Sequence, residues 1–175
     1  MVDRVSQRSS AWNKIFDALA IAVIAFAVWK IFIAPRSLIA PGTHPAPHAV
    51  YDLLGGGEFR VADQRGRLVF LDFYATWCEP CKLELPLVER WARAHSHSLV
   101  VPIDVGERRS VVADFARRYS LENVAFDPSA RSRALFDLQG FPTILVVDPH
   151  GYIRAKWEGL NPAISLALTN AERSL

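Results

Sequence analysis

The sequence has little cysteine: its 175 residues include only two, Cys78 and Cys81. No disulfide other than one between these two can form within the chain. A two-residue gap closes too small a loop to stabilise the fold much through chain entropy. We therefore expect the pair to do chemistry rather than to hold the structure together.

The sequence also lacks a basic block, an aromatic-basic stripe and an internal repeat. Its 20 Lys and Arg and its 18 Asp and Glu are interspersed, and the formal net charge is +2. This distribution argues against a nucleic-acid partner. The length suffices for one domain with its own core and for an appendage.

Hydrophobic residues make up 51% of the chain, and the excess lies near the N-terminus. Residues 18–29 are wholly apolar, and after Lys30 the run continues to Ala34. This is near the shortest length for a helix that crosses a bilayer. We predict a polar N-terminal tail over residues 1–14 and a transmembrane anchor over residues 15–34.

The alternative to an anchor is a cleaved signal peptide, which has a similar layout. A cleavage site needs small residues at −3 and −1, and the candidates Ala34 and Ala40 are each followed by proline. The uncleaved anchor is therefore the favoured interpretation. Three basic residues precede the span, and Lys30 and Arg36 lie at and just beyond its end, so by a margin of one residue the positive-inside rule favours a cytoplasmic N-terminus and an exported C-terminal domain.

Residues 35–49 contain four prolines and one glycine, a composition that predicts a semi-extended linker. Residues 50–175 predict one globular domain, with Val111 facing its core and Asn161 capping its last helix. The expected strands are residues 58–62, 68–75, 99–105, 124–126, 143–147 and 152–157, and the expected helices are residues 81–95, 110–119, 129–138 and 162–173. This alternation predicts an α/β fold, a sheet with helices on both faces.

The cysteine pair lies where the strand over residues 68–75 gives way to a helix, with Pro80 in the first turn, where proline is tolerated. A helix N-terminus stabilises a thiolate, which is the reactive form of cysteine. Cys78, at the exposed end, is expected to attack a substrate disulfide, and Cys81, one turn deeper, to resolve the mixed disulfide. The carboxylate of Glu79 should oppose thiolate formation and favour reducing behaviour.

Two acids near the pair are candidate proton acceptors for Cys81. Asp72 lies within the apolar strand, where burial of its charge should raise its pKa. Glu84 follows Cys81 by one helical turn. Either carboxylate could take the proton from Cys81 during the resolving step. The alternative is that Glu84 is solvated and that Asp72 points outward from the end of the strand.

A metal site is a weaker interpretation of the cysteines. One Cys-x-x-Cys supplies two of the four ligands that zinc needs, and His95 and His97 lie at the far end of the following helix, roughly 20 Å away. We predict no metal, and no cofactor other than the redox-active disulfide between Cys78 and Cys81. Two buried and inert thiols are the other alternative.

The run Trp77-Cys78-Glu79-Pro80-Cys81, followed by Glu84 and Pro86, and the run Gly140-Phe141-Pro142-Thr143 resemble the TlpA/ResA/DsbE group of membrane-anchored thiol-disulfide oxidoreductases. The resemblance covers residues 50–170. It implies a thioredoxin-like fold, with a central mixed sheet flanked by helices. It also implies that Cys78 is the nucleophile, Cys81 the resolving cysteine and Glu84 the active-site glutamate of the group.

The same resemblance implies that Pro142 is a cis-proline that packs against the cysteines. The backbone of Phe141 would then be free to pair with a substrate peptide as an added strand. We expect substrate contacts from Trp77, Glu79, Pro80, Phe141 and Thr143, and residues 124–138 resemble the insertion that the group carries relative to thioredoxin.

Asp72 departs from the group, which more often has asparagine at this position. The chain would therefore carry two candidate proton acceptors, Asp72 and Glu84. If both are buried near Cys81, they should titrate as a coupled system.

The function that the resemblance implies is the reduction of disulfides in exported proteins such as apocytochrome c. The protein would be a single-pass protein of the cell inner membrane whose C-terminal domain faces the periplasm. An electron-donating membrane thiol-disulfide transporter would re-reduce it, because an oxidising compartment offers no pool of reductant. The alternatives are a disulfide-donating oxidase and a binding module, either a thioredoxin-fold chaperone or a metal-handling protein.

Overall fold

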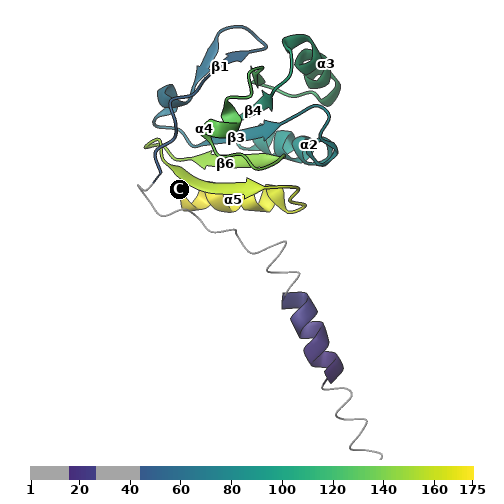
Figure 1. Cartoon of the computed structure of the whole chain (residues 1–175). Coiled ribbons are helices and arrows are strands. Elements are labelled where there is room, and N and C mark those ends of the chain that lie inside the picture. Colours follow the sequence, from purple (N-terminus) through teal and green to yellow (C-terminus); the bar gives the residue numbers. More distant parts are fainter. Residues whose placement is uncertain (1–15, 27–43) are drawn as a thin grey trace, which may run out of the picture. The chain divides into compact units, whose positions relative to one another are not determined.

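A computed structural model describes residues 16–26 and 44–175 of the chain, which divides into two units, Met1–Ala34 and Pro35–Leu175. In the first unit, residues 16–26 are helical (Figure 1). Within the described residues, no helix is both long and apolar enough to cross a membrane. The predicted tail, the rest of the predicted anchor and most of the predicted linker lie outside the described residues.

The second unit is built on one mixed sheet of seven strands in the order β2-β1-β5-β4-β3-β6-β7. The neighbours β3, β4 and β5 run parallel, and every other neighbouring pair is antiparallel. The strands are β1 (Val50–Leu53), β2 (Glu58–Arg60), β3 (Val69–Tyr74), β4 (Leu99–Val105), β5 (Ala125–Asp127), β6 (Thr143–Val147) and β7 (Ile153–Glu158). The expected α/β fold with a mixed central sheet is confirmed.

One face of the sheet carries the three longer helices, α2 (Glu79–Ala94), α3 (Arg109–Tyr119) and α5 (Ile164–Ser174), and α5 lies along the edge formed by β6 and β7 (Figure 1). The apolar side chains of β3 and β6 on this face pack against α2 and α5. The opposite face is covered by short pieces: residues 46–49, the 3-10 helix η2 (Val61–Gln64) and α4 (Ser132–Leu135) with the residues after it. All six residues of β3 are buried, because both faces of this strand are covered.

The region between β5 and β6 contains less helix than the sequence predicts. The expected helix over residues 129–138 is reduced to α4, which has four residues. Ala130 and Asp137 adopt left-handed backbone, with φ of 54° and 50°, and residues in that conformation cannot continue a right-handed helix. The carboxylate of Asp127 accepts from the backbone N–H and the hydroxyl of Ser132, which holds the start of α4.

Two details of the helices also differ from expectation. Val111 is exposed, because the buried stripe of α3 follows the spacing of Val112, Phe115 and Ala116 and leaves Val111 beside it. Asn161 does not cap α5, which begins at Ile164 after a turn in which the side-chain oxygen of Asn161 accepts from the N–H of Ala163.

The described end of the predicted linker contacts the domain. His44 accepts a backbone hydrogen bond from Ile153, and Ala46 donates one to Gly151. Ala49 is buried against the core and leads directly into β1, a strand that the sequence pattern did not predict.

Candidate active site

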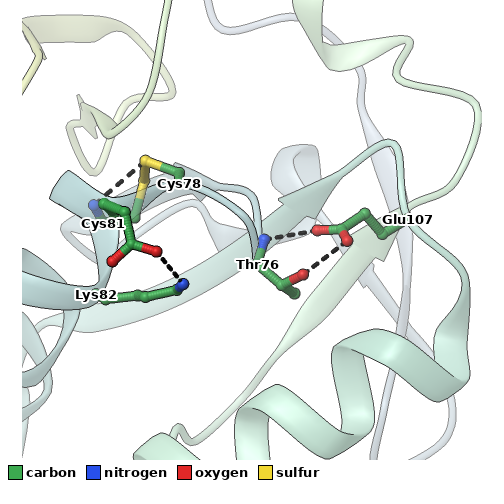
Figure 2. A network of polar contacts seen from close by, with 6 residues as sticks. Thr76, Cys78, Cys81, Lys82 and Glu107 are labelled. Carbon is green, nitrogen blue, oxygen red and sulfur yellow. Dashed lines mark hydrogen bonds and ion pairs between the residues drawn. A yellow bond between two sulfur atoms is a disulfide. The ribbon is translucent and has the colours of Figure 1, made fainter.

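The two cysteines lie at the junction of β3 and α2, as the sequence predicts. Cys78 is the N-cap residue of α2, and its sulfur accepts a hydrogen bond of 3.2 Å from the N–H of Cys81. The pair forms a disulfide with a Cα–Cα distance of 5.3 Å (Figure 2). A sulfur in the N-cap position meets the positive end of the helix dipole, so a thiolate formed there after reduction is stabilised.

Cys78 is less exposed than the sequence predicts. Cys78 is only 4% exposed and Cys81 is fully buried. The side chains of Tyr74, Leu85 and Phe115 form the cluster that surrounds both cysteines. Cys78 is the more accessible of the two, but a substrate disulfide can reach it only by close contact with the surface around it.

That surface is aromatic. Trp77 is 64% exposed, and its ring and that of Phe141 meet edge to face, with 6.1 Å between their centroids. Phe141 in turn packs against the cluster that holds the cysteines, and the guanidinium of Arg133 lies over its ring at 4.6 Å. An exposed tryptophan on the rim of a buried disulfide is an apolar contact surface for a protein chain.

The predicted cis-proline is present: the peptide bond between Phe141 and Pro142 is cis. Pro142 is buried, and its carbonyl accepts from the N–H of Gly159. Within the described part of the chain, the N–H and C=O of Phe141 take part in no hydrogen bond, so both are available to an added strand.

The other predicted contact residues are divided between surface and core. Glu79 and Pro80 are exposed in the first turn of α2, where Glu79 pairs with Lys82. Thr143 is fully buried between β3 and β7, and its hydroxyl donates to the carbonyl of Gly140. Thr143 therefore shapes the turn before β6 from inside the sheet.

Glu84 is buried rather than solvated. It is 2% exposed, and one carboxylate oxygen accepts a hydrogen bond of 2.7 Å from the N–H of Asn161. Burial raises the pKa of Glu84 to about 7, and the hydrogen bond from Asn161 only partly offsets this effect. Because residues three apart on a helix are neighbours, Glu84 lies beside Cys81 and can change its protonation state near neutral pH.

Asp72 is also buried, and it does not point outward. Neither of its carboxylate oxygens has a hydrogen-bond partner among the described residues. Burial raises the pKa of Asp72 well above its usual value, and the neighbouring charges of Glu84 and Glu89 raise it further. The structure therefore brings Asp72 and Glu84 into one electrostatic unit, as the sequence predicts.

Three further acids at this end of the fold were not predicted. Glu89, one turn and a half along α2 from Glu84, is buried, and burial raises its pKa to about 6. Asp104, the sixth residue of β4, is fully buried, and Glu107 follows it in the loop before α3. An acid within an apolar strand was the signal that pointed to Asp72, and the same signal applied to β4 would have found Asp104.

An open pocket of about 250 Å³ lies between the first turn of α2 and α3, and its lining consists of Thr76, Lys82, Val111, Asp114, Phe115, Arg118 and Tyr119. It is a mixed polar and aromatic hollow beside the redox pair. Over the described residues, no group of three or more His, Cys, Asp or Glu side chains is arranged to hold a metal ion.

A disulfide at the N-terminus of a helix, a cis-proline directly after the Phe141 that packs against the cysteines, and buried acids in the flanking strand and helix, all on this mixed sheet, define a thioredoxin-fold thiol-disulfide oxidoreductase. The model of the AhpC/TSA family matches residues 43–156, and the chain belongs to this family. The match spans the sheet from its first strand to most of β7 and includes both cysteines.

Curated relatives and solved structures agree with this class. The chain is 28% identical over 136 residues to the thiol-disulfide oxidoreductase ResA of Bacillus subtilis, across 76% of this chain and 75% of ResA. It is 29% identical over 137 residues to ResA of Geobacillus kaustophilus, across 77% and 78% of the two chains. A crystal structure from Chlorobium tepidum, described as a candidate thiol:disulfide interchange protein DsbE, superposes with a TM-score of 0.70 at 26% identity, across 75% of this chain and 94% of that one.

Proposed function

We propose that this oxidoreductase works as a membrane-anchored protein disulfide reductase that acts on exported proteins. The single observation that carries the direction of electron flow is the group of buried acids behind the redox pair. Asp72 and Glu84 lie in β3 and α2, on either side of Cys81 in the sequence, and the charges that act on Asp72 are those of acids.

This environment favours the disulfide over the dithiol. A strong oxidant of this fold owes its high reduction potential to stabilisation of its reduced, thiolate form. Here the helix N-terminus stabilises a Cys78 thiolate, but negative charge on Glu84, whose pKa of about 7 lets it ionise near neutral pH, opposes it. A cysteine pair whose thiolate is less stabilised has a lower reduction potential, and its dithiol form therefore reduces substrate disulfides more readily.

The reaction balances over two thiol–disulfide exchanges. In the reduced protein, the Cys78 thiolate attacks one sulfur of a substrate disulfide, which forms a mixed disulfide and releases one substrate thiolate. Glu84 then accepts the proton of Cys81, and the resulting thiolate attacks the sulfur of Cys78. The second substrate thiol leaves, two electrons have passed to the substrate, and the protein carries the Cys78–Cys81 disulfide.

The substrate chain would lie over the aromatic rim. Its backbone would pair with the free N–H and C=O of Phe141, while its apolar side chains contact Trp77. This arrangement brings a substrate disulfide to Cys78, the less buried sulfur.

The reduction potential tests the direction of electron flow. We expect the full chain, equilibrated against glutathione or dithiothreitol buffers, to have a potential near or below about −200 mV, in the range of reducing members of the fold. A potential near about −120 mV, typical of oxidants that donate disulfides, would contradict the reductase and support the oxidase.

Membrane anchoring rests on the apolar run over residues 18–34, of which residues 18–26 lie in the helix over residues 16–26. We place the protein in the inner membrane, with the domain in the periplasm. After alkaline extraction, the full chain should stay with the membrane. Because the chain has only two cysteines, a membrane-impermeant maleimide applied to reduced spheroplasts should label the domain; labelling only after lysis would contradict this orientation.

Substrates and the electron donor can be trapped on the redox pair. A Cys81→Ser variant lacks the resolving thiol and should accumulate mixed disulfides between Cys78 and exported proteins, for which we propose apocytochrome c or another metalloprotein precursor. A membrane thiol-disulfide transporter that lacks its own resolving cysteine should likewise form a stable mixed disulfide with the oxidised protein. If the double variant Cys78→Ser, Cys81→Ser kept full function in cells, a chaperone or metal-handling role would replace the reductase.

A further inference from the structure

Glu107, which lies outside the cysteine motif, reaches the segment that leads into Cys78. Its two carboxylate oxygens accept two hydrogen bonds from one residue, Thr76: 2.6 Å from the backbone N–H to Oε2 and 2.7 Å from the hydroxyl to Oε1 (Figure 2). In Figure 2, Thr76 lies between the Glu107 carboxylate and the disulfide. Hydrogen bonds to a charged acceptor are stronger than those between neutral groups.

Thr76 is two residues before the nucleophile, and little chain separates the two. The N–H of Cys78 donates to the carbonyl of Ala75 at 3.1 Å, so residues 75–78 form one tight turn. That turn sets the N-cap position in which the sulfur of Cys78 meets the N–H of Cys81. Displacement of Thr76 therefore moves the sulfur of Cys78 away from the helix N-terminus.

Glu107 is itself held firmly. Gly106 has a φ of 100°, a conformation that favours glycine, and its N–H donates to the carbonyl of Asp127 at 2.8 Å. The N–H of Glu107 donates to Asp104, which is fully buried in β4. Burial, together with the neighbouring Glu107, raises the pKa of Asp104 to about 8.

We propose that Glu107 is a positioning residue for the redox pair: by clamping Thr76, it holds Cys78 in the N-cap position where its thiolate is stabilised. The proposal rests on the redox use of the pair and not on the direction of electron flow. Other charged groups near this segment are Glu79, which is paired with Lys82, and Arg133 over Phe141. Asp114 and Arg118 of α3 line the pocket beside Thr76.

The thiol pKa of Cys78 tests the proposal, because the two ways in which Glu107 could act on it have opposite signs. Glu107→Gln removes a negative charge, which by itself would lower the pKa of Cys78. It also removes one of the two acceptors for Thr76, because the amide nitrogen is a donor. If the clamp matters, the thiolate loses its place at the helix end and the pKa rises.

The experiment measures alkylation of the reduced full chain by iodoacetamide as a function of pH, together with the reduction potential. We expect Glu107→Gln and Thr76→Val each to raise the pKa of Cys78, so that the alkylation rate at pH 6 falls about three- to tenfold. If the equilibrium shifts tenfold, the reduction potential becomes about 30 mV more negative. The conservative Thr76→Ser, which keeps both donors, should restore the pKa.

A matched control exists at the other end of β4. The hydroxyl of Ser98 donates to Glu172 on α5 at 2.6 Å, a contact of the same chemistry remote from the cysteines. Glu172→Gln and Ser98→Ala should leave the pKa of Cys78 unchanged. Thr76 is only partly buried, so Thr76→Val carries the test alone if Glu107→Gln does not fold.

An unchanged or lowered pKa of Cys78 in Thr76→Val, or a lowered pKa in a folded Glu107→Gln, would overturn the proposal. Failure of the proposed reductase function has a different signature. It would show as an oxidising potential in the unsubstituted protein, whatever the response of the variants.

Discussion

Asp72 and Glu84 carry ionisable groups into the core at the back of the redox pair. Their carboxyl groups differ in how they are held, because Glu84 accepts an N–H from Asn161 while neither oxygen of Asp72 has a partner among the described residues. Burial is the main reason that both pKa values are raised, and the charge of Glu84 acts on Asp72 as well. Glu84 is therefore the group that ionises near neutral pH, with Asp72 coupled to it.

Glu84→Gln should remove the pH dependence of the resolving step near neutrality. In the unsubstituted protein, the rate of release of a mixed disulfide should rise with pH and level off above about pH 7, as Glu84 becomes ionised. In Glu84→Gln the rate should be lower on the order of 100-fold, and the change near pH 7 should be lost. Single-turnover release of a fluorescent peptide from a mixed disulfide with Cys78 measures both.

Glu89→Gln is the matched control for this prediction, since Glu89 is a buried glutamate on the same helix whose pKa is raised to about 6. In Glu89→Gln, the rate of release of the mixed disulfide should still change near pH 7. If Asp72→Asn abolishes that change and Glu84→Gln does not, Asp72 is the proton acceptor.

At the scale of elements, α2 presents the cysteines and α5 holds α2 in place. The two helices share one apolar face of the sheet, and the indole N–H of Trp91 on α2 donates to the hydroxyl of Thr169 on α5 at 2.9 Å. The turn before α5 also provides the N–H of Asn161 to Glu84. Docking of α5 therefore supports both the position of α2 and the hydrogen bond at the proton acceptor.

Leu168→Ala should destabilise the domain and loosen α5. Leu168 is fully buried against β3 and α2, and the loss of a buried leucine typically costs about 2–5 kcal/mol of unfolding free energy. Leu166→Ala on the same helix is the control, because its side chain is 53% exposed and its loss should cost less than about 0.5 kcal/mol. Equal urea midpoints for the two variants would contradict this account of how α5 packs.

Across the whole domain, more of the buried acids have a raised pKa than a lowered one. Burial raises the pKa values of Asp72, Glu84, Glu89 and Asp104, whereas hydrogen bonds lower those of Asp127 and Asp148. A group with a raised pKa binds more protons in the folded state, so its share of stability is complete below its unfolded pKa and is lost as pH rises through its folded pKa. Acids with a lowered pKa lose their share only below about pH 4.

The oxidised full chain should therefore be most stable near pH 5 and less stable at pH 8. We expect the unfolding free energy to fall by about 2–4 kcal/mol over this interval, measured by urea unfolding with the disulfide intact. Glu84→Gln should reduce the fall by about 1–3 kcal/mol, because the pKa of Glu84 lies at about 7 within the interval. Greater stability at pH 8 than at pH 5 would show that these acids are not buried as described.

Much of the fold and the site follows from local patterns. The strands β4 and β6 were predicted residue for residue, and the ends of β3, α2 and α3 to within two residues. Runs of apolar residues and helical spacing depend only on neighbours in the chain, so they are legible without the fold. The shortening of the helix expected over residues 129–138 could not be predicted in this way. The hydrogen bonds that Ser132 donates to Asp127 and the left-handed backbone of Ala130 override the local preference for helix.

The sequence by itself determined the chemistry: two cysteines one turn apart at a helix start, with a glutamate a further turn along. These spacings along the chain are local, and any helix that begins at Cys78 places the three side chains on neighbouring turns. Only the tertiary structure decided what surrounds the pair. Glu107 reaches Thr76 across 31 positions because the parallel strands β3 and β4 end at the same edge of the sheet. Asn161 reaches Glu84 across 77 positions because β7, which runs in the same direction as β3, also ends there. Contacts of this kind depend on strand order and register, which the packing of the whole domain sets.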